Sequence, residues 1–124
     1  MIIGIGCDII EIKRIEKSLQ QDGFLMKYFT DREIELIEGR GVREIEVAAV
    51  NFCAKEAVVK AMGIGFGDIR PKDIEVLREE SGAPYVVLYG KAKEELERRG
   101  GQKVLVSLSH SNGVAVGFVV VEGE

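Results

Sequence analysis

The chain has 124 residues and a formal net charge of −4, with 46% hydrophobic and 31% charged residues. This length predicts one domain, residues 1–124, with a core of its own, and the composition argues against disorder. The acidic balance and the few aromatic residues argue against nucleic-acid binding. No apolar run approaches the roughly 20 residues of a membrane span, and no basic segment precedes the first strand. We therefore expect a cytoplasmic protein that binds neither nucleic acid nor membranes.

The two cysteines and the single histidine do not form a metal-binding motif. Cys7 and Cys53 lack the spacing of zinc ligands, and one histidine does not complete a site with them. We expect both cysteines to be small apolar core residues, reduced rather than joined in a disulfide.

The first half of the chain predicts one strand followed by three helices. An apolar strand covers Ile2–Asp8, and the next segment has apolar residues at helical spacing as far as Gly23. Thr30 and Glu33 fit a capping box, which predicts a helix from about Asp31 to Glu38. The longest helical pattern, REIEVAAVNFCAKEAVVKAMG, ends at Gly63, which is suited to a left-handed cap.

The second half predicts a hairpin, a short helix and two final strands. IEVLREE and YVVLYG flank the turn SGAP, KAKEELERRGG is a charged surface helix, and KVLVSLSHS and GVAVGFVVVE meet at a turn around Asn112. This order predicts an α+β domain, in which a largely antiparallel sheet packs on a long central helix.

Three polar residues stand in apolar surroundings. Asp8 is either the N-cap of the following helix or a ligand for a metal or phosphate. Glu56 and Lys60 lie one helical turn apart, so they can form a surface ion pair. Alternatively, Glu56 binds a divalent cation and Lys60 binds a phosphate group. His110 ends a strand. In a chain with almost no other polar residues in apolar segments, we expect the three positions to converge on one site that suits Mg²⁺.

Three segments resemble the signature blocks of the bacterial holo-acyl-carrier-protein synthases, the short class of 4′-phosphopantetheinyl transferases. They are GIGCDIIEIKRIE, FCAKEAVVKAMGIG and VSLSHSNGVAVGFVVVE, and YFTDREIE and SGAP resemble two further blocks of the family. The match runs nearly from end to end and in order. It implies the 4′-phosphopantetheinyl transferase fold, homotrimers with a site at each subunit interface, and a role in fatty acid biosynthesis. The implied reaction is Mg²⁺-dependent transfer of phosphopantetheine from coenzyme A to a serine of apo acyl carrier protein, releasing adenosine 3′,5′-bisphosphate.

The resemblance also implies roles for individual residues. Asp8 and Glu56 would hold Mg²⁺ against the pyrophosphate, and with Lys60 they form the implied catalytic set. The residues implied to bind coenzyme A are Lys60, Gly63, Gly65, Pro84 and His110. The serine nucleophile comes from the carrier protein, and its proton passes to Glu56 or to a metal-held water.

A basic face accompanies these residues on an otherwise acidic chain. It consists of Lys13, Arg14, Lys17 and Lys27. Without the resemblance, we would expect these residues to form a solvated helix face with no binding role. With the resemblance, they imply a docking face for the acidic carrier protein, in which Arg14 matches a position that the family uses.

The chain departs from the family pattern at Lys27 and Asn51, where arginine is frequent, and at Val59, where the residue is often small or polar. At Asn51, a phosphate contact is therefore missing or supplied elsewhere. Two other functions stay open on the sequence: a non-catalytic oligomeric module that binds acidic partners through its first helix, and a different nucleotide-dependent enzyme using the same metal site.

Overall fold

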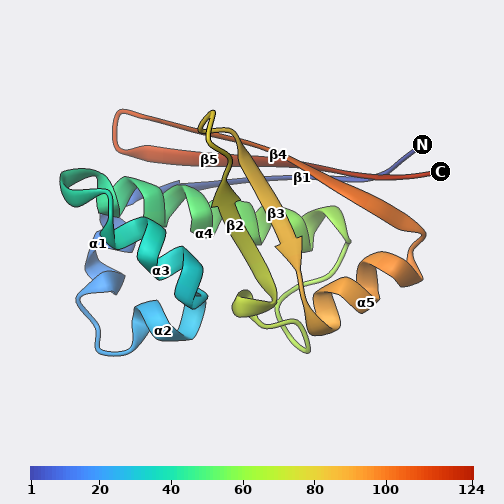
Figure 1. Ribbon diagram of the computed structural model, residues 1–124, viewed down its shortest axis with the longest axis horizontal. Coiled ribbons are helices and arrows are strands. Elements are labelled where there is room, and N and C mark those ends of the chain that lie inside the picture. Colours follow the sequence, from blue (N-terminus) through green and yellow to red (C-terminus); the bar gives the residue numbers. More distant parts are fainter.

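The central helix α4 (Glu44–Ala61) carries small or branched apolar residues around most of its circumference. Such a helix requires cover on several sides. In the computed structural model, which describes residues 1–124, two sheets provide that cover (Figure 1). A three-stranded antiparallel sheet, in the order β1-β5-β4, lies along one side of α4, and the antiparallel hairpin β2-β3 crosses another.

The remaining elements pack around the ends of α4 (Figure 1). The strands are β1 (Ile2–Glu11), β2 (Ile74–Arg78), β3 (Pro84–Leu88), β4 (Gly101–Ser111) and β5 (Val114–Gly123). The other helices are α1 (Ile12–Leu19), α2 (Phe24–Tyr28), α3 (Asp31–Glu38) and α5 (Gly90–Arg98). This α+β, single-domain architecture confirms the predicted fold class. No helix combines the length and hydrophobicity needed to cross a lipid bilayer.

Two local predictions from turn and cap chemistry are confirmed. Thr30 and Glu33 form the reciprocal capping box of α3, which covers the predicted residues Asp31–Glu38. Gly63 follows α4 with a φ of 70°, in the left-handed region that glycine adopts without steric cost.

The strand β1 is longer than the sequence predicts, and Asp8 is not a helix cap. The ladder with β5 continues from Asp8 opposite Gly117 to Glu11 opposite Val114. Helix α1 therefore starts only at Ile12, and the residue before it, Glu11, makes no side-chain cap. Pairing with a distant strand thus outweighs the local preference of aspartate for a cap position.

Glycines let β1 approach α4 closely. A Cβ atom on Gly6 would lie 2.0 Å from the carbonyl oxygen of Ala57, and one on Gly4 would lie 2.0 Å from that of Ala61. Only glycine fits at such a distance. The contact fixes β1 against the C-terminal half of α4.

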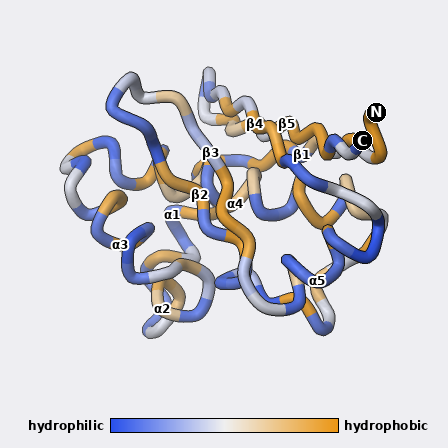
Figure 2. The backbone as a smooth tube through the Cα atoms, turned by 45° about the vertical axis from the view of Figure 1, so that its right-hand side comes forward, coloured by the Kyte–Doolittle hydropathy of each residue, from blue (hydrophilic) through white to orange (hydrophobic).

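The opposite face of the three-stranded sheet is apolar and uncovered. Neighbouring strands align Ile5 with Val120 and Leu105, and Cys7 with Phe118. The exposed fractions of Ile5 and Phe118 are 64% and 43%. The outer face is defined here as Ile5, Cys7, Ile9, Leu105 and Phe118. The strands β1 and β5 are accordingly hydrophobic along much of their length in Figure 2. Cys7 is exposed on this face, so its predicted core position is wrong, whereas Cys53 is buried; both are free thiols.

A buried polar network joins α3, α4 and β2, which contradicts the expectation of few such groups. The Nζ atom of Lys55 lies 2.7 Å from Oε1 of Glu33, and both side chains are almost fully buried. Asn51, Asp73 and Glu75 are also buried. No buried side-chain nitrogen or oxygen lacks a partner, so the network satisfies the requirement for pairing in the core. Helix periodicity alone does not distinguish Lys55 from a solvated lysine.

Candidate active site

Strand β1 and helix α4 bring Asp8, Glu56 and Lys60 together. The Nζ atom of Lys60 lies 3.0 Å from Oδ1 of Asp8 and donates to the carbonyl oxygen of Cys7 at 3.1 Å. Lys60 is thus paired with the aspartate of the neighbouring strand rather than with Glu56, the helical partner that the sequence suggests. The close approach of β1 to α4 positions Asp8 for this contact.

The two carboxylates repel each other across this site. Partial burial raises the pKa of Glu56, and the nearby charge of Asp8 raises it further, against the opposing influence of Lys60 and Arg14. The hydrogen bond to Asp8 raises the pKa of Lys60. A half-buried carboxylate beside a second one favours an added cation, because a positive charge relieves both the repulsion and the burial.

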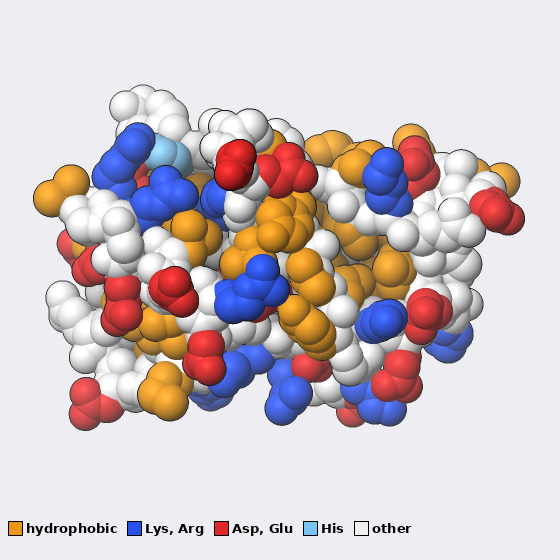
Figure 3. Space-filling view, viewed as in Figure 1, with side chains coloured by type: hydrophobic (Ala, Val, Ile, Leu, Met, Phe, Trp, Pro, Cys, Tyr) orange, Lys and Arg blue, Asp and Glu red, His pale blue; other side chains and the backbone are white.

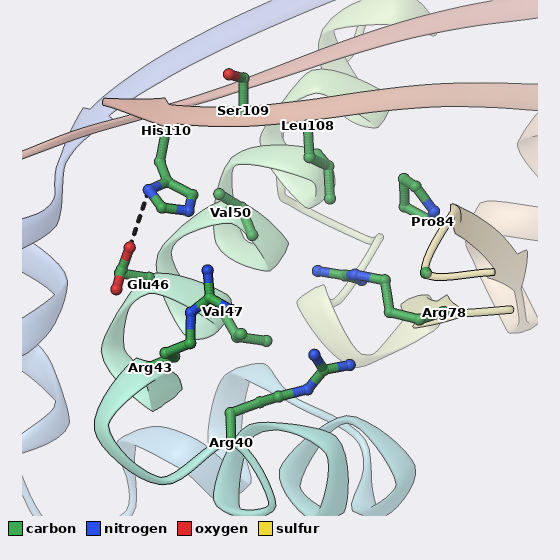
Figure 4. Close-up of a pocket in the computed structure, with 11 residues that line it drawn as sticks. Arg40, Arg43, Glu46, Val47, Val50, Arg78, Pro84, Leu108, Ser109 and His110 are labelled. Carbon is green, nitrogen blue, oxygen red and sulfur yellow. Dashed lines mark ion pairs between the residues drawn. The ribbon is translucent and has the colours of Figure 1, made fainter. Parts of the chain in front are cut away.

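His110 lies at the other end of α4, so one chain does not gather the three predicted polar residues into one site. Its Nδ1 atom is 2.9 Å from Oε2 of Glu46, near the start of α4 (Figure 4). Glu46 and Glu56 are separated by ten residues of this helix, which corresponds to about 15 Å along its axis. The expectation of a single convergence within the chain is therefore wrong.

The pocket beside His110 is rich in arginine. It has a volume of about 300 Å³, and its lining includes Arg40, Arg43, Arg78 and Pro84 (Figure 4). In the space-filling view, the single histidine accordingly lies among Lys and Arg side chains (Figure 3). None of the three arginines makes an ion pair; the only carboxylate of the pocket, Glu46, faces His110. An uncompensated cluster of this kind suits an anion with more than one charge.

Sequence reasoning missed these arginines, although two of them carried a signal. Arg40 and Arg43 lie on either side of Gly41, directly before α4. Cations are unfavourable at a helix N-terminus because they oppose the helix dipole. Two arginines at such a point therefore indicate a binding role. Arg78 carried no such signal, because only the fold brings the end of β2 to this pocket.

The other predicted residues lie in separate places. Pro84 lines the pocket with His110, whereas Gly63 and Gly65 follow the C-terminal end of α4. Gly65 lines a different hollow, together with Asp68 and Lys91. A Cβ atom on Gly65 would meet nothing within 4 Å, so its backbone is open to a ligand.

The predicted basic face is exposed and unpaired. Lys13, Arg14 and Lys17 project from α1, and Lys27 projects from α2 over the ring of Tyr28, with its Nζ atom 5.5 Å from the centroid. None of the four side chains forms an ion pair within the chain. Arg14 is near enough to Glu56 to lower its pKa, so the basic face adjoins the carboxylates.

Asn51 is buried rather than exposed to a ligand. Its Oδ1 atom accepts a hydrogen bond of 2.8 Å from Nη2 of Arg78. The arginine that the family pattern favours at position 51 is thus absent, and a guanidinium from β2 lies beside this asparagine instead.

Comparison with known proteins assigns the family. The model of the 4′-phosphopantetheinyl transferase superfamily matches residues 4–119. The chain belongs to this superfamily. A holo-[acyl-carrier-protein] synthase of Clostridium perfringens is 46% identical over 129 residues, an alignment that covers all of this chain and 96% of the relative. The chain is therefore an enzyme, a phosphopantetheinyl transferase similar to the holo-acyl-carrier-protein synthases.

Solved structures of this transferase family confirm the fold. The holo-(acyl-carrier-protein) synthase of Bacillus anthracis, in complex with CoA (3′,5′-ADP), is 39% identical, with a TM-score of 0.83 and coverage of 100% of this chain and 99% of that one. The Helicobacter pylori enzyme, in complex with coenzyme A, is 32% identical, with a TM-score of 0.83 and coverage of 95% and 99%. The predicted family and fold are therefore correct.

Proposed function

We propose that this enzyme transfers the 4′-phosphopantetheine group of coenzyme A to a serine hydroxyl of apo acyl carrier protein. The serine oxygen attacks phosphorus, the pyrophosphate P–O bond breaks, and adenosine 3′,5′-bisphosphate leaves. The observation that carries the proposal is the group of Asp8, Glu56 and Lys60, held by β1 and α4 in a chain of this superfamily. The relatives that bind coenzyme A support the choice of donor.

The donor set at this site fits Mg²⁺. Asp8 and Glu56 are two half-buried carboxylates whose mutual repulsion a cation relieves, and Mg²⁺ commonly takes one or two carboxylates together with phosphate oxygens and water. No third protein ligand accompanies them. When bound, the ion supplies charge neutralisation at the pyrophosphate.

The protein side chains provide the other requirements of phosphoryl transfer. Lys60 presents a fixed positive charge, held by Asp8, for a phosphate oxygen of the donor. Glu56 or a water molecule accepts the serine proton. No nucleophile is required from the enzyme, because the carrier protein supplies it.

The arginine pocket provides a second binding region for coenzyme A. Arg40, Arg43, Arg78 and His110 suit a phosphate group, while Pro84 offers an apolar surface to the nucleotide. Gly65 leaves the backbone open beside the end of α4, and Gly63 next to it has only the side chain of Arg99 nearby. This pocket lies near the start of α4, whereas Lys60 lies near its end. A single chain therefore carries two separate parts of the site, the arginine pocket and the group of Asp8, Glu56 and Lys60.

A homotrimer joins such halves between neighbouring subunits. The outer face of the sheet provides an apolar surface for a second copy of the chain, with Ile5 and Ile9 exposed to 64% and 66%. In a cyclic assembly the contact is heterologous, so each interface combines different parts of two identical subunits. Light scattering should give three times the 13.7 kDa of one chain, and Ile5→Lys should shift the mass towards that of a single chain.

The basic face provides a docking surface for the carrier protein. Lys13, Arg14, Lys17 and Lys27 are exposed and unpaired, and they adjoin Glu56 through Arg14. An acidic partner gains association rate and orientation from such a face. We place the activity in fatty acid biosynthesis, as the relatives' acyl-carrier-protein names suggest, and in the reducing cytoplasm, which suits two free thiols.

Intact-mass spectrometry tests the proposal. Apo acyl carrier protein incubated with the enzyme, coenzyme A and Mg²⁺ should gain the mass of one phosphopantetheine group, and EDTA should abolish the gain. Asp8→Asn and Glu56→Gln should abolish it without unfolding the chain. An unchanged carrier mass, with folded enzyme and competent carrier, would instead favour a binding module without catalytic activity.

A further inference from the structure

Arg78 differs from the other two arginines of the pocket because it is tethered. It is the last residue of β2 and is half-buried. Its Nη2 atom donates to Oδ1 of Asn51 at 2.8 Å, and its Nη1 atom donates to the adjacent carbonyl oxygen of Leu77 at 3.3 Å, whereas the side chains of Arg40 and Arg43 make no hydrogen bond within the chain. A planar guanidinium with one edge fixed presents its remaining donors in a defined direction.

The orientation of the Asn51 amide is determined by two further contacts. Asn51 is fully buried, and its Nδ2 atom donates to Oε2 of Glu33 at 3.2 Å and to the carbonyl oxygen of Val76 at 3.0 Å. A flipped amide would turn its oxygen towards these two acceptors and its NH₂ group towards the arginine. Only the observed orientation leaves Oδ1 free to accept from Arg78.

Glu33 is in turn anchored in the core. Its Oε1 atom lies 2.7 Å from Nζ of Lys55 and accepts from the amide of Thr30, and its Oε2 atom also accepts from the amide of Val76. The contacts thus run without a break from Lys55 through Glu33 and Asn51 to Arg78. A buried network in which every member is satisfied is rigid.

The tether holds Arg78 in an electrostatically unfavourable position. Partial burial lowers the pKa of Arg78, and the nearby Arg40 lowers it further, with Glu33 opposing. Arg78 has no carboxylate in an ion pair with it. A bound phosphate would compensate the positive charge of Arg78. The network therefore orients this guanidinium before the ligand binds, and only a ligand neutralises its charge.

We propose that Asn51 is a positioning residue that holds the guanidinium of Arg78 towards the pocket, and that Arg78 thereby determines the affinity for a phosphate group of coenzyme A. This inference rests on the proposed function, because the ligand is the coenzyme A of that reaction. It adds how Arg78 is oriented for that contact, and it adds Asn51 as the residue through which the buried network acts.

Substitution of Arg78 separates a directed contact from a general positive charge. Arg78→Gln and Arg78→Lys should both raise KM for coenzyme A about 10-fold to 100-fold, the effect of one hydrogen bond to a charged group. The kcat should stay within about 3-fold, because the contact lies away from the reacting phosphorus. Arg70→Gln, which removes an exposed arginine ahead of β2, should leave KM unchanged. An Arg78→Lys enzyme with the parental KM would overturn the directed contact.

A double-mutant cycle tests the role of Asn51. Asn51→Ala should raise KM for coenzyme A about as much as Arg78→Gln, and the two changes together should raise it no further, because Asn51 acts through Arg78. A purely structural asparagine would lower Tm and leave KM unchanged, and additive effects on KM would also refute the proposal. If Asn51→Ala does not fold, Asn51→Ser, which also removes the Oδ1 acceptor but keeps a polar group, takes its place in the cycle.

Direct binding separates this inference from the proposed reaction. Calorimetry with adenosine 3′,5′-bisphosphate should show the same loss of affinity in the Arg78 variants as the KM values do. If the parental enzyme forms no holo carrier protein, the proposed function fails whatever the variants do. If it forms holo carrier protein and the Arg78 variants retain the parental KM, only the inference fails.

Discussion

Replacing Gly6 by alanine should separate strand β1 from helix α4 and disturb the site at Asp8. The new Cβ atom would lie 2.0 Å from the carbonyl oxygen of Ala57 and 2.7 Å from the amide nitrogen of Ala61, whereas ordinary contacts begin at 3.4 Å. Both atoms belong to the helix backbone, which does not turn aside as a flexible side chain does. The strand and the helix must therefore move apart by roughly 1 Å or more.

This separation affects both stability and catalysis. Overpacking of this kind costs about 1–3 kcal/mol, which corresponds to a fall in Tm of roughly 4–15 °C for a domain of this size. Asp8 lies two residues further along the same strand, and a misplacement of about 1 Å lowers a rate on the order of 100-fold. Circular dichroism gives Tm, and the rate of carrier modification well below Tm gives the activity.

Gly67→Ala provides a matched control for Tm. A Cβ atom at Gly67 meets nothing within 4 Å, and its backbone is not in the left-handed region. This variant should keep the parental Tm. An unchanged Tm for Gly6→Ala, or full activity in a destabilised Gly6→Ala enzyme, would refute the argument that close packing at Gly6 positions Asp8.

Three further results follow from burial. Without a bound metal, the pKa of Glu56 is raised above its ordinary value of 4.5, so an NMR titration of the metal-free enzyme should show this carboxylate becoming protonated above pH 4.5; protonation at or below pH 4.5 would contradict this. Lys55→Met leaves Glu33 charged and unpaired in the core, and denaturant melts should show a loss of about 3–5 kcal/mol, whereas a loss below about 1 kcal/mol would refute the burial. Burial raises the pKa of Cys53 to about 12, so a thiol reagent should label it only after unfolding; labelling in the native state would contradict this.

Features that depend on neighbours in sequence were predicted well. The capping box at Thr30, the left-handed Gly63 and the turn at Asn112, whose φ is 51°, each depend on a few consecutive residues. Backbone sterics and short-range hydrogen bonds act at that range, so residue identity is sufficient to predict them.

Features that depend on distant strands and helices were not predicted. Asp8 remained in a strand because β5, more than a hundred residues away, continues the ladder past it. Lys55 is buried because Glu33 and β2 surround its amino group, and no helix periodicity reveals that. The same holds for the candidate site. The resemblance indicated Asp8, Glu56 and Lys60, but it did not indicate the arginine pocket, because that pocket forms only where β2 meets the start of α4.

The most direct test of a site shared between subunits is complementation between two variants, each with little activity when coenzyme A is well below its KM. One chain carries Asp8→Asn and keeps the arginine pocket, and the other carries Arg43→Ala and His110→Ala and keeps Asp8. In randomly mixed cyclic trimers, one interface of each mixed trimer unites the two intact halves, so the mixture should recover roughly a quarter of the parental rate. A mixture no more active than the two variants measured separately would contradict a site shared between subunits. It would indicate that a single chain contains the complete site.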